Sequence, residues 1–168
     1  MIIKHGDIVL RDATKEDSIQ LTKWWNDGKV MSHAGFPNGL GITNEEVIQN
    51  LHKGQLIIEY KQVLIGECHY KELEDNKASI GIKICEEDYQ NKGLGKIILS
   101  VLIEWLFQSG YTKIILDTNL TNTRAQHVYE SLGFKKIKIN IDSWINAVGE
   151  YQSSVDYELV ESDFKKYL

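Results

Sequence analysis

Cysteine and proline are both scarce in this chain of 168 residues, which has two cysteines and one proline. Cys68 and Cys85 each lie inside an apolar stretch with the pattern of a strand. Two such thiols are too few for a disulfide framework or a set of metal ligands, so we expect reduced core cysteines and no metal site. Pro37 falls in a glycine-containing loop, and no repeat, low-complexity segment or linker interrupts the chain. The sequence therefore predicts one domain that spans residues 1–168.

Long apolar runs and clusters of positive charge are missing as well. The longest apolar run, Ile97 to Phe107, is interrupted by Ser100 and Glu104 and is too short to cross a bilayer. The first seven residues contain no apolar signal-peptide core. The formal net charge is −5 and no basic run is present, which argues against a nucleic-acid partner. We therefore expect a cytoplasmic protein with neither a membrane nor a nucleic-acid partner.

The hydrophobic pattern alternates between strand and helix periods along the chain. It predicts strands at residues 8–10, 55–60, 63–73, 78–85, 113–117, 134–141 and 155–160. Helices are expected at 14–25, 43–53 and 122–132, and a further helix begins at Leu94 and is closed by Gly110. The first two helices open with capping-box patterns, in which an acidic residue follows a threonine by three positions.

A crossover from strand to helix to strand lies at the centre of this pattern, at residues 78–85, 94–110 and 113–117. Such connections are nearly always right-handed, so the two strands run parallel. The other neighbouring strands are joined by short turns and are expected to be antiparallel. The sequence therefore predicts an α/β (α+β) fold with a mixed, mostly antiparallel sheet that is flanked by helices and contains a central parallel pair.

A glycine-containing turn stands at the entrance of the crossover helix. Its residues are Gln90, Asn91, Lys92, Gly93, Leu94, Gly95 and Lys96. The first turn of a helix carries unpaired N–H groups and partial positive charge, and glycine lets a phosphate approach the backbone. A helix entry with no ligand explains the two glycines almost as well. A P-loop motif is absent, and Ile98 stands where a dinucleotide-binding fingerprint requires glycine or alanine.

A second motif follows in the predicted helix at 122–132. Its pattern is Asn122-x-Arg-Ala-x-x-x-Tyr129-x-x-x-Gly133-Phe134. In order and separation, this motif and Gln90-x-x-Gly-x-Gly95 resemble the two cofactor motifs of the GNAT superfamily of N-acetyltransferases. The motifs lie within residues 78–134, and the order of elements extends the resemblance to most of the chain. Within the superfamily, the chain resembles the ribosomal-protein alanine N-acetyltransferases.

The resemblance implies acetyl-coenzyme A as the co-substrate and assigns residues to it. The two parallel strands would splay apart, with the thioester between them, and the backbone of residues 90–96 would hold the pyrophosphate. The strand residues that would pair with the pantetheine arm are Ile82, Lys83 and Ile84. Contacts from the second motif would come from Asn122, Arg124 and Tyr129.

Tyr129 is the expected catalytic acid, because the resemblance places it near the sulfur and a phenol can protonate a departing thiolate. The general base is open. Asp117 ends the strand before Asn122, where some GNAT enzymes that acetylate protein N-termini carry a glutamate. Glu67 and His69, which alternate onto one face of their strand, are the other candidates.

The acceptor is expected to be a primary amine that attacks the thioester directly. An α-amino group lies about 1.4 kcal/mol from its neutral form at pH 7 and a lysine side chain about 4.6 kcal/mol, so an α-amine needs less help from a base. We predict an acceptor wall in the segment 24–36, with Trp24, Trp25 and Phe36 as its contacts. The other side would be closed by Ser143, Trp144, Tyr151 and Gln152. We interpret the chain as an N-acetyltransferase that acts on a protein or peptide α-amine. The resemblance also allows a homodimer, because dimers are frequent in the superfamily. The alternatives are an aminoglycoside, polyamine or amino-acid derivative as acceptor, and a non-catalytic acyl-coenzyme A sensor.

Overall fold

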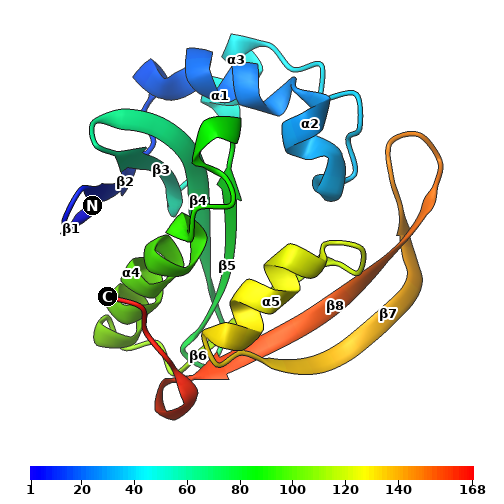
Figure 1. Ribbon diagram of the computed structural model, residues 1–168. Helices are drawn as coiled ribbons and strands as arrows, with labels where there is room; N and C mark the ends of the chain where they lie inside the picture. Colours follow the sequence, from blue (N-terminus) through cyan, green and yellow to red (C-terminus); the bar gives the residue numbers. More distant parts are fainter.

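A computed structural model describes residues 1–168 (Figure 1). The strands are β1 (Ile2–His5), β2 (Ile8–Asp12), β3 (Gln55–Tyr60), β4 (Val63–Leu73), β5 (Lys77–Ile84), β6 (Lys113–Asn119), β7 (Lys135–Ile145) and β8 (Tyr151–Val160). The α-helices are α1 (Ser18–Trp25), α2 (Gly28–Met31), α3 (Asn44–Asn50), α4 (Leu94–Gln108) and α5 (Thr123–Ser131). Short 3-10 turns are η1 (Lys15–Asp17), η2 (Ser32–Ala34), η3 (Glu87–Tyr89) and η4 (Glu161–Asp163).

All eight strands form one sheet in the order β1-β2-β3-β4-β5-β6-β8-β7. The pair β5–β6 is parallel and every other pair is antiparallel, which confirms the predicted fold class. Sequence periodicity did not indicate β1 or α2, because β1 is a short edge strand and α2 is a single turn. It also placed the start of β8 four residues late, at residue 155 instead of Tyr151.

The two halves of the sheet are joined by a short seam. β5 and β6 are in register at only three pairs, the last of which is Ser79 with Ile115. Beyond that point β5 continues to Ile84 and β6 to Asn119 without pairing to each other. The parallel strands are therefore splayed at their carboxyl ends, as expected, and both faces of the sheet are accessible from the gap.

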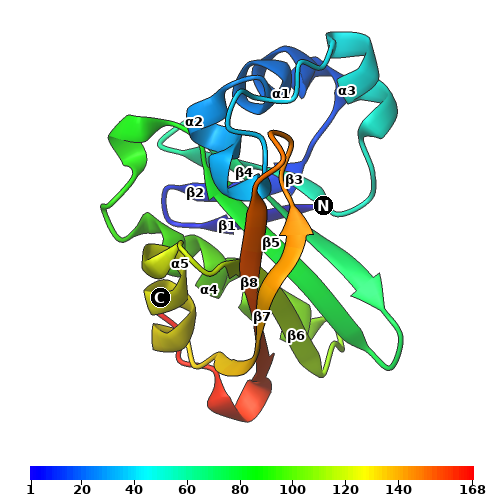
Figure 2. The ribbon, with the colours of Figure 1, turned by 90° about the vertical axis from the view of Figure 1, so that its right-hand side faces the viewer.

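Helices cover the two faces of the sheet unequally. A large core of 25 buried residues lies under α4 and α5, and Ile98, Leu102 and Leu106 of α4 are completely buried in it. A smaller core on the other face contains Leu21 of α1 and Val47 of α3. Figure 2 shows α4 and α5 beside each other on one side, with α1, α2 and α3 gathered at one end of the molecule. The larger core holds α4 and α5 firmly against the seam.

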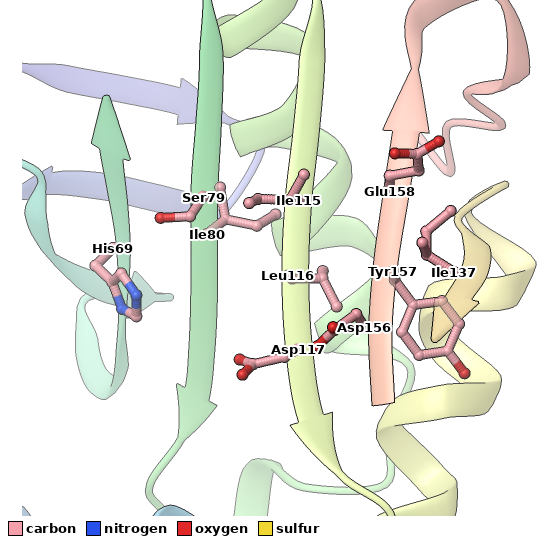
Figure 3. A pocket seen from close by; sticks show the side chains of 10 residues that line it. All are labelled: His69, Ser79, Ile80, Ile115, Leu116, Asp117, Ile137, Asp156, Tyr157 and Glu158. Atoms are coloured by element: carbon pink, nitrogen blue, oxygen red, sulfur yellow. The ribbon is translucent and has the colours of Figure 1, made fainter. Parts of the chain in front are cut away.

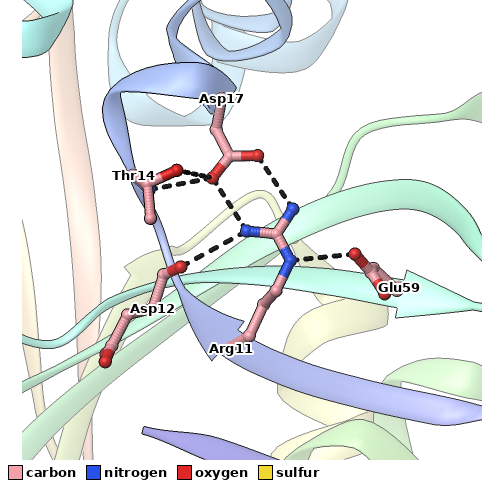
Figure 4. Close-up of polar contacts among 5 residues, drawn as sticks. All are labelled: Arg11, Asp12, Thr14, Asp17 and Glu59. Atoms are coloured by element: carbon pink, nitrogen blue, oxygen red, sulfur yellow. Dashed lines mark hydrogen bonds and ion pairs between the residues drawn. The ribbon is translucent and has the colours of Figure 1, made fainter.

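Both predicted capping boxes form. The Thr43 hydroxyl accepts a hydrogen bond from the N–H of Glu46, and the Glu46 carboxylate accepts one from the N–H of Thr43. At the first box, the Asp17 carboxylate accepts a hydrogen bond from the N–H of Thr14 and also receives the Arg11 guanidinium (Figure 4). Arg11 donates to both Asp17 oxygens at 2.8 Å and, through Nε, to Glu59 at 2.8 Å. One arginine therefore ties β2 and β3 to the start of α1.

We expect Asp17→Asn to lower the free energy of unfolding by about 2 to 3 kcal/mol, because it leaves a bidentate arginine without its charged partner. Burial alone would raise the pKa of Asp17, but Arg11 and the N–H of Thr14 outweigh it and the net pKa is lowered. A lowered pKa stabilises the fold above the unfolded value of about 3.9, and this contribution is lost as the pH falls through the folded value. Urea titrations should therefore show the two proteins converging below about pH 4.

Asp163→Asn is the matched control, because Asp163 forms an ion pair with Lys135 at the surface, 3.2 Å apart. Its effect should stay within about 0.5 kcal/mol at every pH. Equal effects of the two substitutions would show that the Arg11 network contributes no more than an exposed ion pair.

Candidate active site

A cavity of about 1130 Å³ opens where β5 and β6 separate. Its walls come from the end of β5, the entrance of α4, the end of β6 and the first turns of α5. The predicted site residues that line it are Ile82, Lys83, Ile84, Gln90, Asn91, Gly93, Leu94, Gly95, Lys96, Asp117, Asn122, Arg124 and Tyr129. Lys92 is exposed and lies outside the lining. The structure therefore brings both sequence motifs to one cavity.

The loop before α4 exposes a row of backbone N–H groups. None of the N–H groups from Asn91 to Lys96 donates to another group of the protein. Asn91 and Gly93 adopt left-handed conformations, with φ of 60° and 77°. Gln90 holds the loop in place, since its side-chain amide donates to the carbonyl of Ile84 at 2.8 Å. Successive free N–H groups in such conformations, at a helix N-terminus, form a site suited to phosphate.

Gly95 is conspicuous because the protein itself gives no reason for a glycine there. Its φ lies outside the left-handed region, and a Cβ would meet no atom within 4 Å. Neither strain nor packing explains the residue, and the position faces the cavity. A ligand that approaches the backbone closely would explain it.

An extended chain can be held between β5 and α5. Beyond Ser79, the edge of β5 that faces β6 has no strand partner. Across the gap, Asn122 caps α5 with its carbonyl oxygen, which accepts from the N–H of Ala125 at 3.2 Å. The Asn122 amide nitrogen makes no hydrogen bond within the protein and remains available as a donor to the cavity. A strand edge and a side-chain amide facing each other match the amide groups of a pantetheine-like chain.

Tyr129 stands at the inner end of this gap. Its side chain is 6% exposed, and its ring packs against Phe134 and Tyr157, with centroid distances of 6.0 and 5.8 Å. Its hydroxyl lines the cavity and makes no hydrogen bond within the protein. Burial, followed by the charge of Asp117, raises the pKa of Tyr129 to about 12. The phenol therefore remains protonated at physiological pH and can donate a proton or hydrogen bond to an atom in the gap.

Asp117 lies on the opposite face of the sheet from Tyr129. Leu116 belongs to the same core as Tyr129, so the alternation of β6 turns Asp117 to the other side. Figure 3 shows its carboxylate pointing from β6 towards β5, beside a smaller cavity of about 430 Å³. The Asp117 side chain is exposed because it opens onto both cavities. Burial, then the carboxylate of Asp156 directly across on β8, raises the pKa of Asp117.

His69 lies on the same face as Asp117 and lines both cavities. Its imidazole lies across Gly81, where a Cβ would come within 2.3 Å of the ring. Burial, then the charge of Lys83, lowers the pKa of His69 to about 4. The neutral imidazole of His69 and the carboxylate of Asp117 therefore lie on either side of β5 and face the gap together (Figure 3).

The model of the acetyltransferase (GNAT) family matches residues 20–134, which is more than half of the chain. The chain belongs to the GNAT family of acetyltransferases.

Several proteins are similar to this GNAT chain. A ribosomal protein bS18 alanine N-acetyltransferase of Escherichia coli is 39% identical over 54 residues, which are 32% of this chain and 36% of that protein. The matched parts span only 18% to 36% of the curated relatives. Among solved structures, RimL, a ribosomal-protein alpha-N-acetyltransferase in complex with coenzyme A, has a TM-score of 0.84 at 16% identity and covers 95% of this chain and 98% of its own. A spermidine N-acetyltransferase from Vibrio cholerae has a TM-score of 0.81 at 20% identity, with 95% and 98% covered.

Glu67 of this GNAT chain is buried and fully engaged, and it lines neither cavity. One carboxylate oxygen accepts from Trp25 Nε1 at 2.9 Å and from Gln55 at 3.2 Å. The other lies 3.5 Å from the ammonium of Lys83. Burial raises the pKa of Glu67, and Lys83 partly offsets that effect. The structure thus places Glu67 in an anchor between α1 and the sheet and leaves Asp117 and His69 in the gap.

The aromatic residues expected at the acceptor wall also lie outside the cavity. Trp24 is 3% exposed and donates to Glu86, Trp25 donates to Glu67, and Phe36 lies at the surface. This wall of the cavity is lined instead by residues of α2, η2, β7 and β8, namely Lys29, Val30, His33, Ala34, Trp144 and Ser154. The first four belong to the segment 24–36 in which the sequence placed the acceptor wall, although the aromatic residues singled out there lie elsewhere. Trp144 was also expected near the acceptor, whereas no sequence signal indicated Ser154.

The tip of the β7–β8 hairpin contacts the residue that follows η2, Gly35. The N–H of Ala147 donates to the carbonyl of Gly35 at 2.8 Å. The Trp144 ring lies so close to Gly35 that a Cβ there would come within 2.5 Å of it. Two segments that are distant in sequence thus lie together at one entrance to the gap.

The structure offers no arrangement of three or more His, Cys, Asp or Glu side chains that could bind a metal ion. None of its helices has both the length and the hydropathy needed to cross a membrane.

Proposed function

We propose that this GNAT enzyme acetylates a primary amine that enters on the Asp117 face of the sheet, with the acetyl-coenzyme A on the Tyr129 face. One observation carries the proposal. The cavity at the seam connects the free N–H groups of residues 91–96 and the Tyr129 hydroxyl with Asp117 and His69 across the sheet. Donor and acceptor sites on opposite faces let the amine attack the thioester directly, without a covalent enzyme intermediate.

The cofactor assignment follows from the chemistry of each wall. The N–H groups of 91–96 are suited to the pyrophosphate, and the cations of Lys96 and Arg124 stand at the same mouth. The free edge of β5, at Ile82 to Ile84, and the Asn122 amide are suited to the pantetheine amides. When bound, acetyl-coenzyme A supplies an activated acyl group and a thiolate leaving group.

Tyr129 supplies the proton or hydrogen bond that the departing sulfur requires. A phenol whose pKa is about 12 is a weaker acid than free tyrosine. The same burial raises the pKa of a thiol, as it does for Cys68 and Cys85 of this chain, so the buried sulfur is also more basic. A thiolate that leaves in this buried gap is thus easier for the phenol to protonate than a thiolate in water.

Asp117 and His69 act on the amine. Both line the gap opposite Tyr129. Asp117, whose pKa is raised by burial, accepts the proton of the amine through water. His69, whose lowered pKa makes it neutral and only weakly basic, accepts a hydrogen bond from the amine. An α-amine needs only about 1.4 kcal/mol to reach its neutral form at pH 7, which weak bases of this kind can provide through water. The ribosomal-protein acetyltransferases among the similar proteins support a protein or peptide α-amine as the acceptor.

A polyamine is the second candidate. Asp117 and Asp156 stand directly across from each other on β6 and β8, and two adjacent carboxylates attract a polycation. The similarity to a spermidine N-acetyltransferase supports the same acceptor.

Thiol release from acetyl-coenzyme A distinguishes these acceptors. The panel should contain a peptide with a free α-amine and no lysine, the same peptide N-blocked with one lysine, spermidine and an aminoglycoside. We expect kcat/KM for the α-amine peptide to exceed that for the lysine peptide at least about 100-fold, because the deprotonation energies differ by about 3.2 kcal/mol. A preference for spermidine would establish the second candidate. Thiol release that no amine accelerates would contradict the enzyme proposal and favour an acyl-coenzyme A sensor.

A further inference from the structure

The segment after β8 runs back across α4 and α5, the two helices that carry the proposed cofactor site. The N–H of Lys165 donates to the carbonyl of Leu132 at 2.9 Å, just after α5. The hydroxyl of Tyr167 donates to the carbonyl of Ser131 at 3.1 Å. Lys166 forms an ion pair with Glu104 of α4 at 2.7 Å. This segment, residues 164–168, therefore connects the two helices to each other.

A second contact fixes the segment to α4 from inside the core. Ser100 lies completely buried on the apolar side of α4, and its hydroxyl oxygen accepts from the N–H of Tyr167 at 3.0 Å. A buried hydroxyl and a backbone N–H each need a partner, so this bond defines where residue 167 sits. It places the Tyr167 ring one helical turn from Ser100, over the entrance of α4.

The Tyr167 ring receives the ammonium of Lys96 at that position, with Nζ 5.1 Å from the ring centroid. Lys96 is half-buried in the first turn of α4 and lines the large cavity. No carboxylate of the protein lies within ion-pair distance of Lys96. An aromatic face attracts a cation through its quadrupole without neutralising it. The ring therefore holds Lys96 while its full charge stays available to an anion.

We propose that Tyr167 is a positioning residue for cofactor binding, which holds the Lys96 ammonium at the mouth of the cavity for a phosphate of acetyl-coenzyme A. This inference rests on the proposed function, in which residues 91–96 bind the pyrophosphate. Tyr167 itself touches neither the acetyl group nor the acceptor, so its effect should appear only with donors that carry phosphate.

The test compares acetyl-coenzyme A with acetyl-pantetheine, which has the same thioester and no phosphate. Tyr167→Leu removes the ring and keeps the backbone N–H that binds Ser100. We expect it to lower kcat/KM for acetyl-coenzyme A about three- to five-fold, the size of an exposed cation–π contact, and to leave kcat/KM for acetyl-pantetheine unchanged. Tyr167→Phe keeps the ring and loses only the exposed hydrogen bond to the Ser131 carbonyl, so it should stay within about two-fold of the wild type with both donors. In a Lys96→Met background, Tyr167→Leu should have no further effect.

Several results would overturn the inference. Unchanged kcat/KM for acetyl-coenzyme A in Tyr167→Leu shows that the ring does not position Lys96. An equal loss with both donors shows that residue 167 only supports the fold. The proposed phosphate site has its own test in Gly95→Asp. If that substitution abolishes cofactor affinity while Tyr167→Leu does nothing, the inference on Tyr167 fails and the phosphate site stands.

Discussion

Tyr129→Phe should lower kcat about 100- to 1000-fold, the contribution of a well-placed general acid. The substitution removes only a hydroxyl that makes no bond within the protein, so packing against Phe134 and Tyr157 should persist. KM for acetyl-coenzyme A should change little, because the phosphate loop and β5 edge are intact. Since the pKa of Tyr129 is about 12, the wild type should show no alkaline loss of kcat from this group up to about pH 10.

Tyr157→Phe is the matched control. Tyr157 packs edge-on against Tyr129 in the same core, and its hydroxyl donates to Glu130 on α5 at 3.3 Å, outside the large cavity. In steady-state kinetics, kcat of Tyr157→Phe should stay within about three-fold of the wild type, since the variant loses at most one partly exposed hydrogen bond. Full turnover by Tyr129→Phe at every pH would contradict the assignment of Tyr129 as the acid. Equal losses in both variants would indicate a packing effect.

Gly95→Asp should weaken acetyl-coenzyme A binding by at least about 100-fold. The new carboxylate would stand in the first turn of α4, among the N–H groups that the pyrophosphate needs, and would add repulsion between like charges. The fold should tolerate it, because Gly95 has no left-handed φ, a Cβ meets no neighbour, and an acidic residue is favourable at a helix N-terminus. Isothermal titration with acetyl-coenzyme A measures the affinity, and thermal unfolding measures the stability.

Gly95→Asn separates charge from size, because its side chain has the same shape without the charge. We expect an affinity loss of about ten-fold for Asn, so that the remaining ten-fold reports the charge, about 1.4 kcal/mol. Affinity that survives both substitutions would show that the phosphates bind elsewhere.

The sequence predicted which residues of α4 and α5 would meet at the large cavity, because residues 90–96 and 122–134 form a helix N-terminus, a cap and a glycine turn, which are local features with recognisable patterns. The wall formed by η2 and the β7–β8 hairpin was less predictable. It depends on contacts between distant segments, such as Trp144 against Gly35. Trp24 and Trp25 illustrate the difficulty. Their indoles satisfy Glu86 and Glu67 inside the protein, and no sequence pattern distinguishes that role from a place at a pocket rim.

The base candidates show the same limit. Alternation along β4 correctly put Glu67 and His69 on one face. Whether each side chain reaches the gap depends on the residues opposite it. Glu67 is held back by Trp25, Gln55 and Lys83. His69 can lie across β5 because Gly81 has no side chain there.

The short seam between β5 and β6 links the stability of the fold to the supply of acetyl donor under the proposed binding mode. In that mode, a donor molecule lying along the unpaired part of β5 would complete hydrogen bonding that the polypeptide leaves open, and it would bind only the folded chain. By mass action, a free donor concentration 100 times its Kd adds about 2.7 kcal/mol to the free energy of unfolding. Differences of this size change how often a protein opens to cellular proteases. Under the proposed binding mode, this enzyme would persist longest when the acetyl donor is plentiful, and scarcity of the donor would shorten its lifetime as well as its turnover.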